Sequence, residues 1–180
     1  MLPRHVVRGA PNPLHFGFAD RLRRARRAAG LTPTALAQKA GSVSRATIAA
    51  LEAGENIPRV DTVESLAKAL ALSPSLLAFG LDSASESLKG KLCDGLPQRL
   101  RDTRRAHGLS MRELGRQADA SVVLVRSTEA GASLPNLARL EALAKALRVS
   151  PAWLAYGEGP LELPPRRRAR QAAQSHTSEM

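Results

Sequence analysis

The sequence predicts an all-α protein of two small domains, each with about five helices, joined by a short linker. Apolar residues recur at spacings of three and four, which places them on one face of a helix. Helix-start signals, such as Thr32-Pro33 and Ser73-Pro74, precede these stretches. A long stretch of the first half also returns 77 to 78 residues later, and such a repeat indicates two copies of one fold.

The first domain is expected over residues 18–81. Its helices are predicted at about 18–28, 33–40, 45–52, 60–71 and 74–80. In the first helix, Phe18, Leu22 and Ala25 should face inward, whereas four arginines should be largely solvated: Arg21, Arg23, Arg24 and Arg27. Gly41 ends the second helix and Ser44 caps the third. Two short helices with a tight turn between them form the skeleton of a helix-turn-helix.

The second domain is expected over residues 96–157. The stretch at 66–70 returns unchanged at 143–147, and Ser73-Pro74 returns as Ser150-Pro151. The two copies differ by one residue in the turn, where Gly41-Ser42-Val43-Ser44 corresponds to Asp119-Ala120-Ser121. The first turn is therefore expected to carry an insertion.

Three segments lie outside these domains. Residues 1–17 contain three prolines and no periodic pattern, which predicts a flexible N-terminal arm. Residues 82–95 are small and polar and form the predicted linker, where Leu88 and Leu92 would allow a short helix. Residues 158–180 contain a basic run after two prolines and are expected to be a disordered tail.

Charge indicates an anionic partner. The formal net charge is +11 and the sequence pI about 11.3, which suits nucleic acid, an acidic protein or a membrane surface. Both domains are positive, at +4 and +5. A single cysteine, Cys93, excludes an internal disulfide and suits a cytoplasmic protein. The sequence has no apolar run near eighteen residues, so no membrane span is expected.

One ordered set of residues resembles a known family. It comprises Arg26, Gly30-Leu31-Thr32, Leu36-Ala37, Ala40-Gly41, Val43-Ser44, Ile48, Leu51-Glu52, Gly54, Pro58, Leu66-Ala67, Leu70 and Leu76-Leu77. This set resembles the phage-repressor and Cro-like (XRE-type) helix-turn-helix proteins. The resemblance implies two tandem five-helix lambda-repressor-like DNA-binding domains, and a transcriptional regulator, more specifically a repressor, with double-stranded DNA as partner. It also implies ion pairs between the first and third helix of each copy: Arg26 with Glu52, and Arg104 with Glu129.

A helix-turn-helix places its second helix in the major groove, which predicts the residues that read bases. In the first copy these are Arg45, Ala46, Ala49 and Ala50, and in the second Val122, Val123, Arg126 and Ser127. Arginine can form a fork of hydrogen bonds with guanine, and small apolar residues can meet thymine methyl groups. Phosphate contacts are expected from helix N-termini and the loop after the third helix, at Thr32, Thr34, Ser44, Asn56, Arg59, Ser110, Arg112 and Asn136.

The sequence departs from the resembling family in two places. The family usually has a glutamine near the start of the second helix, where this chain has Pro33 and Met111. In addition, the third helix of the second copy begins with four apolar residues, 122–125, of which the core needs only one. An exposed apolar patch more often marks a protein interface than a DNA contact.

Enzyme chemistry finds little support in the sequence. The four histidines are scattered and no glycine-rich phosphate loop is present, so no catalytic site, metal or cofactor is expected. No third domain that would sense a small-molecule effector is expected from the sequence.

Three arrangements remain open at this stage. One chain could imitate a two-fold dimer, with two recognition helices about 34 Å apart on one face of an asymmetric site. Alternatively, the second domain could form a homodimer, so that two copies of Arg45 read a palindrome. The rival function is a protein-interaction adaptor that has lost base reading and holds a partner through residues 122–125.

Overall fold

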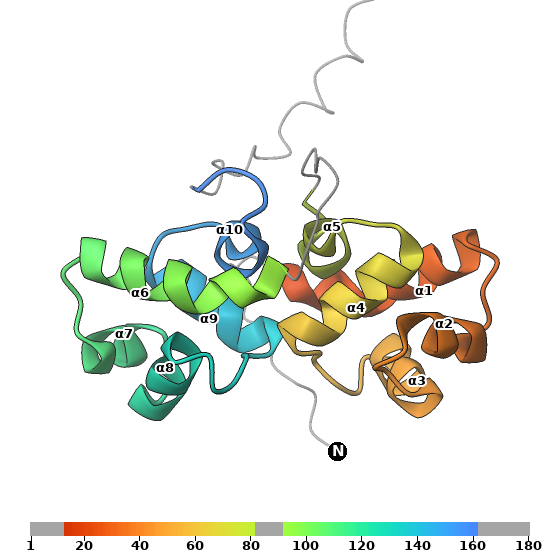
Figure 1. Cartoon of the computed structure of the whole chain (residues 1–180), viewed down its shortest axis with the longest axis horizontal. Helices are drawn as coiled ribbons and strands as arrows, with labels where there is room; N and C mark the ends of the chain where they lie inside the picture. The colour runs from red at the N-terminus through yellow and green to blue at the C-terminus, as the bar shows by residue number, and fades with distance from the viewer. Residues whose placement is uncertain (1–12, 82–91, 162–180) are drawn as a thin grey trace, which may run out of the picture.

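The computed structural model describes residues 13–81 and 92–161, which form ten α-helices and two short 3-10 helices in two domains (Figure 1). The first domain contains η1 (Leu14–Gly17), α1 (Phe18–Ala28), α2 (Pro33–Ala40), α3 (Arg45–Ala53), α4 (Val60–Leu70) and α5 (Pro74–Phe79). The second contains η2 (Leu92–Gly95), α6 (Leu96–Ala106), α7 (Met111–Gln117), α8 (Val122–Glu129), α9 (Leu137–Ala146) and α10 (Pro151–Tyr156). The predicted all-α tandem fold is confirmed.

Local sequence explains where the helices begin. The Thr32 hydroxyl accepts a hydrogen bond from the Ala35 N–H at 3.1 Å, and Ser73 does the same for Leu76 at 3.0 Å. In the second copy, Ser110 and Ser150 cap α7 and α10 in the same way. Each cap satisfies one backbone N–H that lacks a partner within the helix.

Each domain contributes a leucine-rich core to a hydrophobic cluster that continues across both domains. In the first copy Leu22, Leu36, Ile48 and Leu66 are fully buried. Their counterparts in the second copy are equally buried: Leu100, Leu114, Val125 and Leu143. The same helical faces therefore form both cores, as the repeat requires.

The turn between the second and third helix has four residues in both copies, which corrects the expected insertion. Residues 41–44 join α2 to α3, and residues 118–121 join α7 to α8. The additional residue of the first copy instead lengthens α2, which has eight residues where α7 has seven. Val43 is buried, and its side chain fixes this turn against the core.

The two domains pack against each other around an approximate two-fold axis. Helix α5 contacts α10, and these two helices lie side by side in Figure 1. Nearby, two reciprocal backbone hydrogen bonds join the segments before α4 and α9. The Leu137 N–H donates to the Pro58 carbonyl at 2.9 Å, and the Val60 N–H donates to the Pro135 carbonyl at 3.2 Å. This short antiparallel bridge centres on Arg59 and Asn136.

The domain boundaries extend beyond those predicted. Residues 14–17 form η1 and belong to the fold, although they were expected in the arm; the rest of that arm, 1–12, lies outside the described residues. Similarly, residues 92–95 form η2 at the end of the predicted linker, whose remainder, including Leu88, lies outside the described residues.

The start of the predicted tail also belongs to the second domain. Glu158 is buried, and the Leu161 carbonyl accepts a hydrogen bond from the Ser150 N–H at 2.7 Å. Residues 162–180 lie outside the described residues.

Candidate nucleic-acid interface

The third helix of each helix-turn-helix, α3 and α8, lies at the same edge of the molecule (Figure 1). The Ser44 hydroxyl caps α3 by accepting from the Thr47 N–H at 3.0 Å, and Ser121 caps α8 by accepting from the Leu124 N–H at 3.1 Å. Ile48 and Val125 anchor the two helices in their cores. The exposed face at the start of each helix, at residues 45–46 and 122–123, is therefore available to a ligand.

Buried ion pairs hold both helices in place. Arg26 on α1 contacts Glu52 on α3 through two hydrogen bonds of 2.6 and 2.8 Å. Its third nitrogen donates to the Leu31 carbonyl at 2.7 Å, which also fixes the chain before α2. The hydrogen bonds that Arg26 donates to Glu52 raise the pKa of Arg26, so this guanidinium stays charged.

The second copy has the same arrangement in a more buried form. Arg104 on α6 contacts Glu129 on α8 through two hydrogen bonds of 2.6 and 2.9 Å. Glu129 is 2% exposed, against 8% for Glu52. The Arg101 guanidinium additionally donates to the Glu129 carbonyl at 2.6 Å. These pairs keep α8 and α3 in fixed positions relative to their own domains, as the resemblance implies.

The predicted base-reading residues of α3 form a small, open surface with one cation. Arg45, Ala46 and Ala49 are exposed, and Ala50 is half-buried. The three alanines leave room for close approach, so the reach of Arg45 beyond the helix is not blocked by neighbours on α3. This chemistry suits one forked contact to guanine beside thymine methyl groups.

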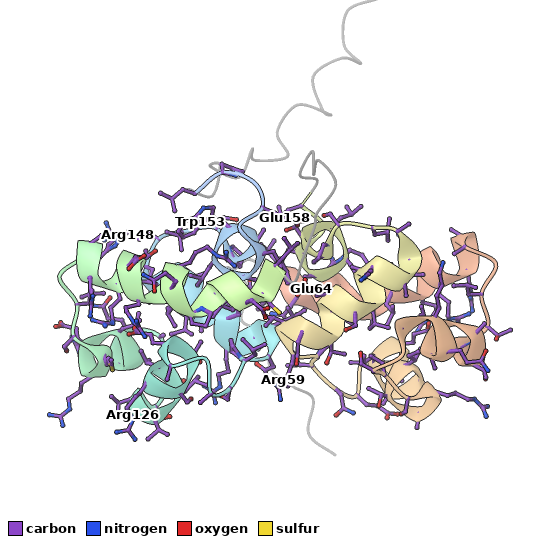
Figure 2. The ribbon with its side chains drawn as sticks, in the orientation of Figure 1. Arg59, Glu64, Arg126, Arg148, Trp153 and Glu158 are labelled. Carbon is purple, nitrogen blue, oxygen red and sulfur yellow. The ribbon has the colours of Figure 1, made fainter. Side chains whose placement is uncertain are left out.

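The corresponding surface of α8 is apolar at its start and polar one turn later. Val122 is 43% exposed and Val123 57%, whereas Val125 is buried. Arg126 is exposed and Ser127 half-buried, and Figure 2 shows Arg126 at the same edge of the molecule as α8. The Ser127 hydroxyl donates to the Leu124 carbonyl at 3.1 Å. Ser127 is thus partly committed to its own helix.

The predicted phosphate-contacting residues fall into two groups. In the first group a side-chain oxygen caps a helix: Thr32, Ser44, Ser110 and Asn136. In the second group the side chain is exposed: Thr34, Asn56, Arg59 and Arg112. A cap oxygen that accepts a backbone N–H leaves the hydroxyl hydrogens of Thr32 and Ser110 and the amide NH2 of Asn136 free to donate, so both groups can meet phosphates.

Arg59 lies between the two domains near the two-fold axis (Figure 2). Its guanidinium contacts the Asp61 carboxylate at 3.3 Å, with both side chains about half exposed. This exposed pair is weak and can be exchanged for a phosphate contact.

Arg21 is not solvated, which corrects the sequence prediction. It is half-buried and donates to the Leu77 carbonyl at 2.8 Å and to the Leu14 carbonyl at 3.1 Å. Its counterpart Arg99 donates to the Leu154 and Leu92 carbonyls at 2.9 and 3.0 Å. Burial lowers the pKa of both guanidinium groups. The recurrence of this arginine in both copies was the available signal for a structural role.

The residues that join the two domains were not predicted from the sequence. Glu64 and Glu141 occupy equivalent positions in the repeat, and each binds backbone N–H groups of the other domain. Their recurrence 77 residues apart is the signal that could have singled them out.

Residues 13–81 and 92–161 contain neither a metal-binding cluster nor a membrane-spanning helix. Within these ranges no group of three or more histidine, cysteine, aspartate or glutamate residues is arranged to hold a metal ion. Nor is any helix there both long and apolar enough to span a bilayer.

Comparisons with known proteins agree with this geometry. Residues 18–79 match a family described as "Helix-turn-helix domain", and residues 100–154 match a second one described as "Helix-turn-helix". Together the two matches span well over half of the chain. Both matches are to helix-turn-helix domains, one in each half of the chain.

One solved structure with sequence similarity is an HTH_3 family transcriptional regulator from Vibrio cholerae. The two proteins are 31% identical, over 36% of this chain and 35% of that one, with a TM-score of 0.34. This chain therefore aligns with about a third of the length of that relative. The two family matches show that the chain carries two helix-turn-helix domains of the XRE type in tandem.

Proposed function

We propose that this chain is a sequence-specific repressor of transcription that binds double-stranded DNA as a single chain. Helices α3 and α8 enter successive major grooves on one face of the duplex. The observation that carries this proposal is the docking of the two domains around a two-fold axis, with α3 and α8 at the same edge of the molecule (Figure 1). Repressors with two identical subunits need such an arrangement to meet two half-sites.

The two recognition helices differ, so the preferred site is asymmetric. Arg45 reads a guanine in one half-site, and the neighbouring alanines meet thymine methyl groups. In the other half-site Val122 and Val123 contact thymine methyl groups and Arg126 supplies the polar contact. The exposure of all four of these side chains supports the assignment.

Phosphate contacts come from both domains. The N-termini of α2 and α7 offer backbone N–H groups, with Thr34 and Arg112 exposed beside them. Asn56 and Arg59 contribute from the loop after α3. The positive charge of each domain, +4 and +5, favours a position against the phosphate backbone. The protein acts in the cytoplasm by binding rather than by catalysis, without a cofactor or a small-molecule effector.

A second candidate function rests on the exposed valines of α8. In this alternative the second domain holds another protein through Val122 and Val123, which are 43% and 57% exposed. The first domain then reads DNA alone, or the chain forms a homodimer on a palindrome.

The test is selection from a randomised pool of duplexes, carried out with the whole chain and with Arg45→Ala, while affinity is followed against salt. We expect an enriched asymmetric site and a steep fall of affinity with salt, because phosphate contacts release counterions. Arg45→Ala should weaken binding by about 5- to 150-fold and relax the preference at one guanine. Arg24→Ala, on the exposed outer face of α1, is the matched control and should leave the selected sequence unchanged.

Two results would overturn the proposal. If no sequence is enriched, or if Arg45→Ala selects the same site with unchanged affinity, then α3 does not read bases. Binding of another protein that is insensitive to salt but is lost in Val123→Asp would instead support the adaptor function.

A further inference from the structure

The two domains are joined by a pair of carboxylates, each of which binds the backbone of the other domain. We propose that Glu64 and Glu141 are positioning residues that fix the spacing and rotation of α3 relative to α8. They thereby determine which half-site spacing the protein accepts. This inference rests on the proposed function, since it concerns how the same DNA site is selected.

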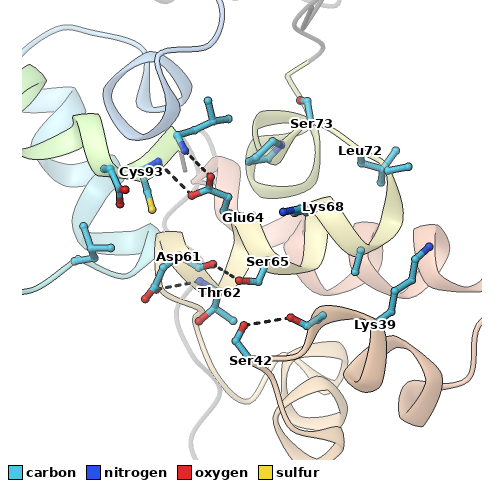
Figure 3. A pocket seen from close by; sticks show the side chains of 17 residues that line it. Lys39, Ser42, Asp61, Thr62, Glu64, Ser65, Lys68, Leu72, Ser73 and Cys93 are labelled. Carbon is cyan, nitrogen blue, oxygen red and sulfur yellow. Dashed lines mark hydrogen bonds between the residues drawn. The ribbon is translucent and has the colours of Figure 1, made fainter. Parts of the chain in front are cut away.

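Glu64 lies on α4 in the first domain and binds the start of η2 in the second. Its two carboxylate oxygens accept from the Leu92 N–H at 2.5 Å and from the Cys93 N–H at 3.2 Å. Figure 3 shows both hydrogen bonds, with the carboxylate directed at the backbone beside Cys93. One side chain thus satisfies two backbone donors that have no partner within their own short helix.

Glu141 makes the reciprocal contact from α9 in the second domain to η1 in the first. Its oxygens accept from the Leu14 N–H at 2.7 Å and from the His15 N–H at 3.3 Å. The His15 ring adds a contact from Nδ1 to the same carboxylate at 2.6 Å, and this ring is 9% exposed. Each domain therefore binds backbone N–H groups of the other domain through one carboxylate.

These contacts act on the segments that lead directly into α1 and α6. The ion pairs of Arg26 and Arg104 then tie those helices to α3 and α8. A rigid route consequently runs from each inter-domain carboxylate to a recognition helix. The backbone bridge at Arg59 and Asn136 and the hydrogen bond from the Tyr156 hydroxyl to the Val60 carbonyl, at 3.1 Å, close the same interface.

DNA geometry makes this rigidity a source of specificity. Each base pair inserted between two half-sites moves them apart by about 3.4 Å and rotates them by about 35°. A rigid pair of domains meets only one such arrangement. Two domains joined only by their covalent linker would still bind together, but they would tolerate several spacings because the tether merely raises the local concentration.

The experiment measures affinity for the selected duplex and for a series with one to five base pairs inserted between its half-sites. The affinity of the wild-type chain should be at least about tenfold lower for each duplex with an insertion, because only one recognition helix remains engaged. The double variant Glu64→Gln/Glu141→Gln should discriminate less than threefold between the same duplexes. Gln cannot accept from two N–H groups with two charged oxygens, yet it keeps the size of the side chain.

Three controls separate positioning from general damage. Asp102→Asn removes one exposed carboxylate from the outer face of α6 and should keep the wild-type spacing profile. A duplex with one half-site destroyed should bind the double variant within twofold of wild type, which shows that the domains remain folded. Reaction of the buried Cys93 with a thiol reagent should be faster in the double variant, because Cys93 lies at the opened interface.

A covalent bridge provides the converse test. Residues 59 and 136 face each other in an antiparallel bridge without hydrogen bonds between them, where Cα atoms lie close enough for a disulfide. Arg59→Cys/Asn136→Cys added to the double variant should restore spacing discrimination when oxidised and lose it again when reduced. Because both states carry the same substitutions, any loss of phosphate contact cancels.

The inference is overturned if the double variant retains the wild-type spacing profile, or if oxidation of the bridge does not restore discrimination. Failure of the proposed function looks different, because the wild-type chain would then show no enriched site and no dependence on Arg45. If the double variant does not fold, Arg59→Cys/Asn136→Cys is introduced into the otherwise wild-type chain, and its spacing profile is measured in the oxidised and in the reduced state. Equal profiles that both discriminate between spacings support the two carboxylates as sufficient. A reduced form that does not discriminate between spacings contradicts the inference.

Discussion

The two copies share their internal frame and differ on the surface that would face DNA. Arg26 and Arg104 form nearly identical contacts with Glu52 and Glu129, and Arg21 and Arg99 bind equivalent carbonyls. On the exposed side, however, Arg45 and Ala46 correspond to Val122 and Val123. The positions that orient a recognition helix are thus the same in both copies, whereas the positions that would read bases are not. This division is expected if both helices must be held alike but meet different half-sites.

The largest expected effect distinguishes the two buried ion pairs. Glu129→Gln should lower the free energy of unfolding by about 3–5 kcal/mol, because it leaves Arg104 buried without its charged partner. Glu52→Gln should cost about 3 kcal/mol or less, since both side chains of that pair are about a tenth exposed. Urea unfolding followed by circular dichroism and by the fluorescence of Trp153 in the second domain measures both. A larger decrease in the free energy of unfolding for Glu52→Gln than for Glu129→Gln would contradict the ranking by burial.

An intermediate effect is expected from the turn, where the copies differ in packing. A Cβ added to Gly115 would lie 2.7 Å from the Ala120 carbonyl oxygen, so Gly115→Ala should destabilise the second domain by about 1–3 kcal/mol. The equivalent position in the first copy already holds Ala37, next to the longer helix α2. Ala37→Gly should cost about 1 kcal/mol through helix propensity alone. The same unfolding assay applies, and a stabilised Gly115→Ala variant would refute the close approach.

The smallest effect concerns an asymmetry at the domain interface. The Tyr156 hydroxyl donates to the Val60 carbonyl, and its counterpart in the first copy is Phe79, which has no hydroxyl. Tyr156→Phe should therefore lower stability by about 1 kcal/mol at neutral pH.

The same residue predicts a dependence on alkaline pH. Burial raises the pKa of Tyr156 well above 10, so the folded protein keeps the phenol protonated while the unfolded chain ionises it. This contribution to stability is present below pH 10 and is lost as the pH rises above it. Tyr156 is the one tyrosine in the chain, so its ultraviolet titration can be followed directly and should coincide with unfolding. Titration near pH 10 in a fully folded protein would contradict the burial.

The sequence predicted the helices well because their signals are local. Thr32-Pro33, Ser44 and Ser73-Pro74 mark helix starts through contacts three residues away. The spacing of Phe18 and Leu22 within α1, and of Ile48 and Leu51 within α3, marks the inward faces. The repeat then carried these predictions to the second copy. Contacts between domains have no such local signature, because Glu64 binds residues 28 and 29 positions away and Glu141 binds residues more than 120 away.

The errors at the domain boundaries have the same origin. Residues 14–17 and 92–95 lack a helical period, so they appeared to be arm and linker, yet a carboxylate from the other domain fixes each one. Arg21 appeared solvated because its position on α1 is polar, but carbonyl groups of α5 supply its partners. In each case the sequence does not indicate which distant element packs against these residues. Most residues predicted to contact DNA are exposed or cap a helix, whereas Ala50 and Ser127 are half-buried. All of these contacts with DNA remain predictions.

The number of chains on the selected duplex tests the central claim most directly. Sedimentation equilibrium of the complex, combined with a footprint of the duplex, gives both the stoichiometry and the protected grooves. We expect one chain per duplex on an asymmetric site, with two protected major-groove segments on one face. Two chains on a palindrome, each protecting one segment that depends on Arg45, would contradict it and assign the second domain to another role.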